Sequence, residues 1–263
     1  MCTLIALVRQ VPGAPLVVAA NRDEFYDRPA EGPALRRMPQ GVIVAPRDVR
    51  AGGTWLGLNE FGLFAALTNR RGADPDPSRR SRGLLVLEAL GARSALEAVE
   101  RIEDRTLRPG TYNPFNLLLA DRESAFALSG GDAARRLPLE PGVHVIGNEA
   151  LDGAPVAKLD AVGLRARGLA RGEPAALLDG LAALCRSHAA DGSDPIASPC
   201  VHTPRYGTRS SLLLRLGERP AEGVLRYADG APCEAPYQDF TPLLRELGRL
   251  PLRGEGETAR SVP

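Results

Sequence analysis

Cys2 is the residue of this chain whose chemistry is best suited to covalent catalysis. Its side chain is small enough to permit removal of Met1, which would leave a thiol and a free α-amino group on one residue. An α-amine has a pKa of about 7.7–8.0, so near neutral pH it can act as a base. The thiol supplies a nucleophile that can form an acyl-enzyme with an amide carbonyl, and water can then release the acyl group. The competing interpretation is a free cysteine in a buried strand, which is common.

Polar side chains follow several apolar runs at the points where strands should end. The sequence Asn21-Arg22-Asp23-Glu24 follows the apolar run 16–20, Asn69 closes another run, and Asn148 follows Gly147. An asparagine amide at such a position can stabilise a developing oxyanion by about 3 kcal/mol. Isolated asparagines at strand ends are also frequent turn formers, and a charged tetrapeptide is often a solvated turn. The residues alone therefore leave both interpretations open.

The elements that must position these residues begin with a predicted β-hairpin. Residues 2–9 and 16–20 are short apolar runs separated by Pro12-Gly13, which is typical of a turn. The start of one strand lies beside the end of its antiparallel neighbour, so the hairpin should bring residues 21–24 close to Cys2.

Further strands and helices are predicted from periodicity and capping signals. Ser94 with Glu97 forms a capping box for one helix. Loops are expected at 26–40 and 70–82. Strands are expected at 42–44, 54–57, 62–67, 115–120, 125–128, 143–146, 212–216 and 223–227, and helices near 84–90, 94–102, 155–169 and 174–186.

Composition excludes several classes of protein. The net charge of +1 gives no electrostatic footprint for nucleic acid. The N-terminal apolar run has no basic region before it, and no segment approaches the length of a membrane span, so we expect neither a signal peptide nor stable membrane insertion. The expected location is the cytoplasm. The sequence does not fix the oligomeric state.

The cysteines and histidines show no metal-binding pattern along the sequence. Four cysteines occur without a CxxC pair, which also argues against a disulfide scaffold. His144, His188 and His202 have no cysteine or carboxylate at ligand spacing. We therefore expect no metal site, and we interpret the three histidines as structural.

An ordered set of motifs runs through most of the chain and resembles the NRDE-domain family, known in eukaryotes as the transport and Golgi organisation 2 proteins. The resemblance covers roughly residues 1–240. The motifs are Met1-Cys2-Thr3, Asn21-Arg22-Asp23-Glu24-Phe25, Gly53-Thr54-Trp55-Leu56-Gly57, Thr68-Asn69-Arg70, Tyr112-Asn113-Pro114-Phe115-Asn116-Leu117-Leu118-Leu119, Gly147-Asn148 and Tyr206-Gly207-Thr208-Arg209-Ser210.

The resemblance implies an α+β fold, a four-layer αββα sandwich of two antiparallel sheets flanked by helices, as in N-terminal-nucleophile hydrolases. Residues 1–250 are then one domain, and residues 251–263 a disordered tail. The family is more distantly similar to the choloylglycine hydrolases and penicillin V acylases, which also begin Met-Cys.

The same resemblance implies roles for five residues. Cys2 is the nucleophile, and Asp23 orients its amine or thiol. Asn69 completes the oxyanion hole, Asn148 holds the amine or the substrate, and Arg209 favours the thiolate and binds negative charge. Substrate contacts are expected from Asn21, Arg22, Glu24, Trp55 and Lys158. Lys158 is the only lysine of the chain, and a surface role is its alternative, as packing is for Trp55.

The chain departs from those hydrolases in the position of the arginine next to Asn21. In those enzymes an arginine stands directly before the asparagine that corresponds to Asn21. This chain has Ala20 at that position, and its arginine, Arg22, follows Asn21 instead. From this shift we expect the Arg22 side chain to face away from the Cys2 thiol.

Two functions are compatible with these residues. The first is an amidohydrolase that cleaves the C–N bond of a non-peptide acyl amide through a Cys2 acyl-enzyme, with no cofactor required. The second, implied by the resemblance, is binding and trafficking of haem or of acyl-CoA or lipid in the same pocket.

Overall fold

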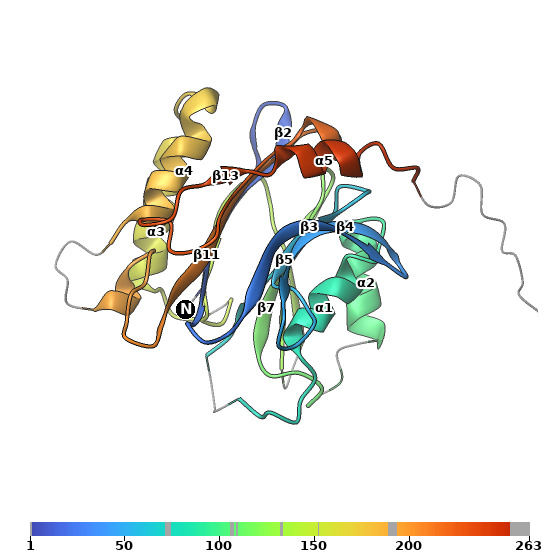
Figure 1. Ribbon diagram of the computed structural model, residues 1–263, viewed down its shortest axis with the longest axis horizontal. Coiled ribbons are helices and arrows are strands. Elements are labelled where there is room, and N and C mark those ends of the chain that lie inside the picture. The colour runs from blue at the N-terminus through green and yellow to red at the C-terminus, as the bar shows by residue number, and fades with distance from the viewer. Residues whose placement is uncertain are drawn as a thin grey trace, which may run out of the picture.

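Two antiparallel sheets lie face to face in the computed structural model, which describes residues 2–71, 75–105, 108, 110–131, 134–151, 153–188 and 194–252 (Figure 1). The first sheet has the order β10 (Gly142–Ile146), β1 (Thr3–Val11), β2 (Ala14–Phe25), β11 (Tyr206–Leu216), β12 (Val224–Ala228), β13 (Gln238–Asp239). The second has the order β3 (Ala30–Met38), β4 (Gly41–Asp48), β5 (Leu56–Asn59), β6 (Phe64–Asn69), β7 (Phe115–Ala120), β8 (Ala125–Gly130), β9 (Arg135–Pro138).

Helices cover the outer face of each sheet. The helices α3 (Ala157–Ala170) and α4 (Leu177–Arg186) pack on the first sheet, and α1 (Arg82–Ala89) and α2 (Ala95–Arg105) pack on the second (Figure 1). Helix α5 (Thr241–Leu247) contacts strands of both sheets, β12 and β4. Three short 3₁₀ helices are η1 (Pro174–Ala176), η2 (Pro195–Ala197) and η3 (Pro220–Glu222). The predicted αββα sandwich is confirmed.

Strand β1 shows why the N-terminal run is apolar on both faces. Leu4 and Ala6 lie in the core between the sheets, whereas Ile5 and Leu7 lie in the core beneath α3 and α4. A strand buried on both sides has no polar face, and its sequence therefore reads as a continuous hydrophobic run. The predicted hairpin forms, and residue 3 pairs with Asn21.

The expectation of a loop over residues 26–40 is wrong, because β3 lies within it. The strand contains Pro33, Glu31 and two arginines, which lowered its apparent strand propensity. Strand β3 is an edge strand that pairs only with β4, with a register irregularity between Glu31 and Ala34. A proline is tolerated at an edge because its missing N–H is not needed by a second neighbour.

The polar segment Tyr206–Ser211 also belongs to a strand, since β11 extends along β2. Thr208 pairs with Asp23, Ser210 pairs with Arg22, and Arg209 lies between them at an irregularity of the register. The pairing brings the Tyr206-Gly207-Thr208 motif beside the acidic end of β2.

Within the described residues, no helix is both long and apolar enough to cross a membrane. The prediction of one domain over residues 1–250 stays a prediction. Most of the tail expected at 251–263 lies outside the described residues.

Candidate active site

A pocket of about 430 Å³ lies beside Cys2, where β2, β4 and β6 end and the segment before α1 passes over them. Six arginines and four acidic residues are among its lining side chains, so positive charge is in excess. The lining comprises Cys2, Arg22, Asp23, Glu24, Arg28, Asp48, Arg50, Ala51, Thr54, Trp55, Leu67, Asn69, Pro75, Asp76, Pro77, Arg79, Arg80, Ser81, Arg82, Gly83 and Asn113.

A second hollow of about 490 Å³ lies elsewhere, lined by residues such as Phe61, Arg93 and Leu250. No cysteine or histidine contributes to its lining. Its acidic residue Asp121 already accepts a hydrogen bond from the Ala95 N–H at the start of α2, at 2.6 Å. Of these two hollows, the pocket at Cys2 is therefore the one that contains a cysteine thiol.

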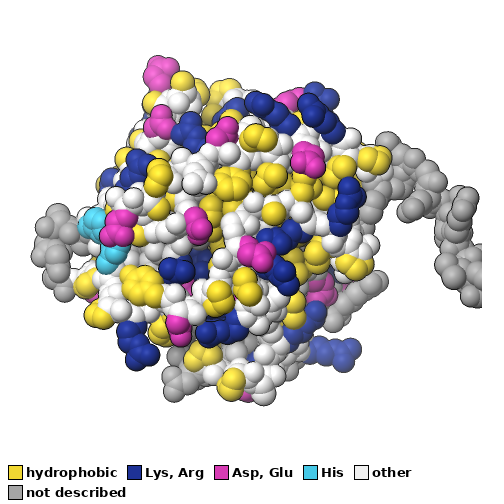
Figure 2. All heavy atoms as spheres, in the orientation of Figure 1, with side chains coloured by type: hydrophobic (Ala, Val, Ile, Leu, Met, Phe, Trp, Pro, Cys, Tyr) yellow, Lys and Arg dark blue, Asp and Glu magenta, His cyan; other side chains and the backbone are white. Residues whose placement is uncertain are grey.

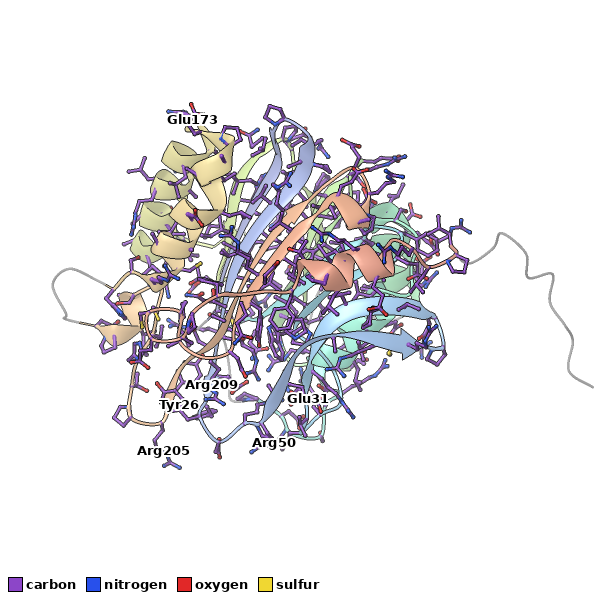
Figure 3. The ribbon with its side chains drawn as sticks, turned by 45° about the horizontal axis from the view of Figure 1, so that its top comes forward. Tyr26, Glu31, Arg50, Glu173, Arg205 and Arg209 are labelled. Carbon is purple, nitrogen blue, oxygen red and sulfur yellow. The ribbon has the colours of Figure 1, made fainter. Side chains whose placement is uncertain are left out.

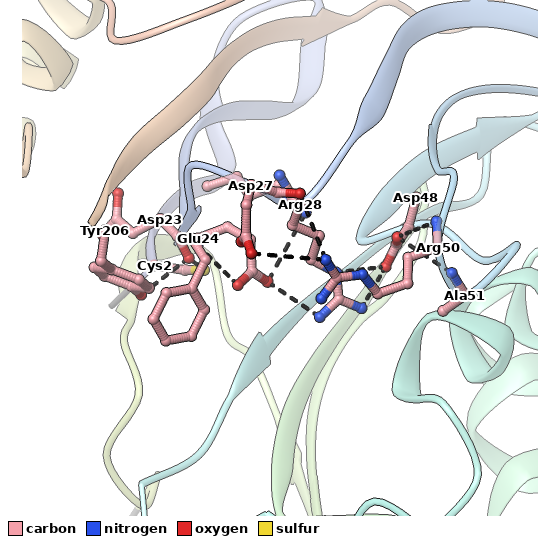
Figure 4. A network of polar contacts seen from close by, with 11 residues as sticks. Cys2, Asp23, Glu24, Asp27, Arg28, Asp48, Arg50, Ala51 and Tyr206 are labelled. Carbon is pink, nitrogen blue, oxygen red and sulfur yellow. Dashed lines mark hydrogen bonds and ion pairs between the residues drawn. The ribbon is translucent and has the colours of Figure 1, made fainter.

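The Cys2 thiol is partly buried in the lining of the pocket, and Figure 4 shows the residue beside Asp23 and Tyr206. Its sulfur lies 3.9 Å from the main-chain oxygen of Asp23. Burial raises the pKa of the thiol above its ordinary 9.0, and the charge of Asp23 adds to this effect while Arg22 opposes it. At neutral pH the sulfur is therefore protonated, and nucleophilic attack requires a base that removes this proton.

Asp23 is held by two residues of β11. Its Oδ1 accepts a hydrogen bond from the Thr208 hydroxyl at 2.6 Å, and its main-chain oxygen accepts one from the Tyr206 hydroxyl at 2.9 Å. The Thr208 hydroxyl in turn accepts a hydrogen bond from the Val201 N–H at 2.9 Å. Burial raises the pKa of Asp23 to about 6, although Thr208 and the charge of Lys158 favour the carboxylate. Asp23 is mainly ionised at neutral pH and gains a proton in mild acid.

The expectation that Arg22 faces away from Cys2 is wrong, because Arg22 lines the same pocket. Positions 20 and 22 differ by two residues, and a strand repeats its facing every two residues, so Ala20 and Arg22 share a face. The Arg22 guanidinium lies 4.2 Å from the centre of the Trp55 ring and 3.9 Å from a Glu24 oxygen. Trp55 therefore holds this arginine by cation–π contact at the pocket wall.

An ion-pair chain extends from Glu24 along the pocket (Figure 4). Arg28 lies 3.6 Å from Glu24 and donates to Asp48 at 2.6 Å. Asp48 also accepts hydrogen bonds from the N–H groups of Arg50 and Ala51. Burial opposes ionisation of Asp48, but its bonds to Arg28 hold its pKa below the usual value. These contacts fix the wall of the pocket and neutralise Arg28.

Arg82 was not singled out in the sequence, yet it lies in this pocket. Its hydrogen bond in the described part of the chain goes to the main-chain oxygen of Pro114, at 2.9 Å. Burial and the nearby charge of Arg28 lower the pKa of Arg82. A cation held in this way can accept an anionic group of a ligand. The abundance of arginine in the chain conceals such a residue from sequence analysis.

Asn69 and Asn148 meet at the end of β6. Asn69 is exposed and lines the pocket. The buried Asn148 side chain donates a hydrogen bond to the main-chain oxygen of Asn69. Both residues also line an adjoining hollow of about 270 Å³, beside Tyr206. Asn148 thus fixes the backbone that presents the Asn69 amide.

Asn21 and Lys158 do not line the pocket, although both were predicted to contact substrate. The Asn21 amide donates to the main-chain oxygens of Cys185 and Pro199, at 2.9 Å each, toward the α4 side of the sheet. Lys158 is buried in α3 and donates to the Ile196 oxygen at 3.2 Å. Burial lowers its pKa, and the charge of Asp23 opposes this. Asn21 therefore attaches β2 to the end of α4 and to the segment before β11. The positive charge of Lys158 favours the ionised form of Asp23.

Arg209 is also separate from the pocket lining. Its guanidinium lies 5.9 Å from the centre of the Tyr26 ring, and Figure 3 shows the two side chains at the same end of the molecule. The residue is the unpaired one at the register irregularity between Thr208 and Ser210, where the regular alternation of side chains along the strand is interrupted. Arg22 and Arg82 line the pocket, and Arg209 does not.

The interpretation of His188 and His202 as lacking cysteine partners is wrong. Ligand atoms of His188, Cys200, His202 and Cys233 all lie within 4.8 Å of one another. Cys200 and His202 are two positions apart, but His188 and Cys233 come from other segments, so the short Cys-x-His spacing alone does not reveal the cluster. His144 is not part of it.

Solved structures with the same fold include a bile acid hydrolase and an acid amidase. A mutant of the conjugated bile acid hydrolase from Clostridium perfringens superposes with a TM-score of 0.52 at 12% identity, covering 93% of this chain and 94% of that one. The Caenorhabditis elegans orthologue of N-acylethanolamine-hydrolyzing acid amidase superposes with a TM-score of 0.50 at 13% identity. The match covers 81% of this chain and 92% of that one. The fold is thus N-terminal-nucleophile hydrolase-like.

Sequence comparison identifies the family. The "Transport and Golgi organization protein 2 homolog" of Bos taurus is 31% identical over 230 residues, 76% of this chain and 81% of the relative. The human homologue is 34% identical over 112 residues, 42% of this chain and 40% of the relative. The family model "Transport and Golgi organisation 2" matches residues 1–219. This chain therefore belongs to the Transport and Golgi organisation 2 family.

Proposed function

We propose that this protein hydrolyses the C–N bond of a non-peptide acyl amide, with Cys2 as the nucleophile. The observation that carries the proposal is the position of the Cys2 sulfur, 3.9 Å from the main-chain oxygen of Asp23 and in the lining of a pocket of about 430 Å³ that Asp23 also lines. This volume is in the range of small-molecule sites, about 300–1,000 Å³. The hydrolase-like fold supports the proposal.

The first step requires a base, because burial keeps the thiol protonated. Removal of Met1 supplies it, since the freed α-amine of Cys2 has a pKa of about 8. The amine takes the thiol proton as sulfur attacks the carbonyl carbon. It then donates that proton to the leaving nitrogen as the C–N bond breaks. The ionised carboxylate of Asp23 stabilises the transient ammonium.

The oxyanion of the tetrahedral intermediate needs a donor at the pocket surface. We assign this role to the exposed Asn69 amide, which lines the pocket and whose main-chain oxygen accepts a hydrogen bond from the Asn148 side chain. Collapse of the intermediate leaves a thioester on Cys2. A water molecule, deprotonated by the same amine, attacks the thioester and releases the carboxylic acid.

The substrate class follows from the charge and shape of the pocket. Arginine is in excess over acidic residues, so we propose an acyl amide that carries a carboxylate or phosphate. The recess between the sheets behind Cys2 measures about 20 Å³. This space is too small for a long acyl chain, which must therefore lie in the open pocket.

The test combines mass spectrometry with turnover. Intact-mass measurement should show loss of Met1, and iodoacetamide should label Cys2 before Cys185, Cys200 and Cys233. A panel of N-acyl amino acids and neutral acyl amides should be hydrolysed by the wild type but not by Cys2→Ala, with Cys185→Ala as the matched control. Retention of Met1, or equal turnover by Cys2→Ala, would falsify the mechanism.

Binding without turnover is the second candidate, and the protonated thiol in an arginine-rich pocket favours it. A neutral thiol is a poor nucleophile, whereas arginines can bind haem propionates or the phosphates of acyl-CoA. Titration with haemin and with palmitoyl-CoA, followed by absorbance and calorimetry, tests this candidate. Saturable binding without hydrolysis of any amide supports it, and the absence of both a spectral change and heat excludes it.

A further inference from the structure

Four potential metal ligands gather at a place that the proposed active site does not use. Cys200 is buried, His202 is half-buried, and His188 and Cys233 are exposed. His188 follows α4, Cys200 and His202 lie between η2 and β11, and Cys233 lies between β12 and β13. Figure 2 shows histidine side chains at the surface of the molecule, so the cluster is accessible from solvent.

The distances within the cluster match those of a tetrahedral zinc site. The two sulfurs of Cys200 and Cys233 are 3.5 Å apart, and the His202 Nε2 lies 3.1 Å from one and 3.6 Å from the other. Zinc with two sulfur and two nitrogen ligands places sulfur atoms about 3.8 Å apart and sulfur and nitrogen about 3.6 Å apart. A disulfide would need a sulfur separation of about 2.05 Å, so these are two thiols.

The backbone around the cluster is already fixed by hydrogen bonds. The Cys200 N–H donates to the Ser187 oxygen at 3.1 Å, which ties the Cys200 segment to the end of α4. Arg186 donates to the Pro232 oxygen at 3.1 Å, which ties α4 to the residue before Cys233. The ligands are therefore held together by contacts that do not depend on a metal.

His202 also has an outer partner of the kind that zinc ligands use. Its Nε2 faces the sulfurs, while its Nδ1 lies 3.9 Å from a Glu234 carboxylate oxygen. A carboxylate near the second ring nitrogen orients a metal-binding imidazole and increases its basicity.

We propose that His188, Cys200, His202 and Cys233 form a binding site for zinc or another thiolate-preferring divalent ion. All four positions come from the protein, which is the arrangement of structural rather than catalytic zinc. Binding converts both thiols to thiolates and releases their two protons to solvent.

The site has a direct structural link to the candidate catalytic carboxylate. Cys200 and His202 flank Val201, whose N–H donates to the Thr208 hydroxyl, and Thr208 donates to Asp23. A metal bound to both flanking residues fixes the segment that positions Thr208. We infer that the ion stabilises the fold next to Asp23 without contacting the substrate.

The test measures zinc in the untagged full-length protein, purified under reducing conditions. Elemental analysis should find about one zinc per chain after dialysis, and cobalt(II) in its place should show thiolate-to-cobalt charge-transfer absorption. Cys233→Ser and His188→Asn change exposed positions, and circular dichroism should show that both fold. Each should lower zinc affinity by at least about 100-fold, because loss of even an outer-shell partner costs about 10–100-fold.

The matched controls are Cys185→Ala and His144→Asn, which remove a thiol and an imidazole outside the cluster. Both should retain one zinc per chain. The proposal is overturned if the wild type binds less than a stoichiometric amount, or if the cluster variants bind zinc as tightly as the controls. An intramolecular disulfide between Cys200 and Cys233 in freshly purified protein would also overturn it.

Discussion

Folding stability favours the protonated form of the buried Asp23, whereas the proposed chemistry uses its ionised form. The protein buries a carboxyl group whose ionised form is needed beside Cys2, and burial raises its pKa from 3.8 to about 6. Between pH 3.8 and about 6, Asp23 therefore binds a proton more often in the folded state than in the unfolded state. Stability contributed by this group therefore falls as the pH rises from about 4 to 6.

The first prediction compares Asp23→Asn with the wild type by urea unfolding between pH 4 and 7.5. As the pH rises through this window, the free energy of unfolding of the wild type should fall by about 3 kcal/mol relative to that of the variant. This figure follows from a shift of roughly two units in the pKa of Asp23. The variant should also lack the rise of activity near pH 6. A constant difference in stability at every pH would show that Asp23 does not titrate as described.

The second prediction concerns Arg82, whose charge meets a carbonyl rather than a carboxylate. Arg82→Gln should raise the KM for a carboxylate-bearing acyl amide by about tenfold or more, which corresponds to about 1.4 kcal/mol. The KM for a neutral amide should hardly change. The exposed Arg245 on α5 provides the control substitution, Arg245→Gln, and an equal effect of both variants would count against a specific site.

At the scale of elements, the pairing of β2 with β11 assembles the site. The two strands bring Thr208 opposite Asp23. Because side chains alternate between the two faces of β2, the polar residues at its end lie in two different environments. Arg22 and Glu24 lie in the pocket, whereas Asn21 is directed toward α4. One short motif thus contributes both to the pocket lining and to the attachment of neighbouring elements.

The third prediction tests the attachment role of Asn21. Asn21→Ala leaves the buried oxygens of Cys185 and Pro199 without this donor, at a cost of about 1–3 kcal/mol for each. Thermal unfolding should show a lower Tm, while the KM of the folded enzyme stays unchanged. Asn113→Ala, at a half-buried position of the pocket wall, removes hydrogen bonds with the backbone of Asp76 and should destabilise less. A raised KM with unchanged Tm would instead indicate a ligand contact.

The fourth prediction concerns Thr208, whose hydroxyl bridges Val201 and Asp23. Thr208→Val removes a hydrogen bond that favours the Asp23 carboxylate, so the pKa of Asp23 should rise further. The acidic limb of the pH–activity profile should move up by about one unit. Thr208→Ser keeps the hydroxyl and should keep the wild-type profile; if it shifts as valine does, the bridge is not the cause.

At the scale of the whole molecule, the positive and negative charges nearly balance, but the pocket has a local excess of positive charge. The net charge is only +1, and Figure 2 shows basic and acidic side chains interspersed over the face that it draws. The pocket nevertheless has more arginines than acidic residues. The proposed preference for an anionic ligand therefore rests on where these arginines lie, and added salt should weaken binding only modestly because the site is partly enclosed.

The amino-acid sequence determined the features that depend on neighbours along the chain. The two-sided apolar runs and the turn at Pro12-Gly13 predict the first hairpin, and the hairpin alone predicts that residues 21–24 lie near Cys2. The ordered motifs implied the αββα sandwich. Strand β3 was missed because an edge strand tolerates proline and charge, and those residues hide its periodicity.

Only the tertiary structure decided which distant side chains share a site. Arg82 became a pocket residue through the packing of α1 against the second sheet. Cys200 and Cys233 became neighbours through the connections around β11 and β12, thirty-three positions apart in sequence. Local periodicity reports which face of an element is buried. It carries no information on which loops meet, because that depends on the pairing and packing of elements far apart in the chain.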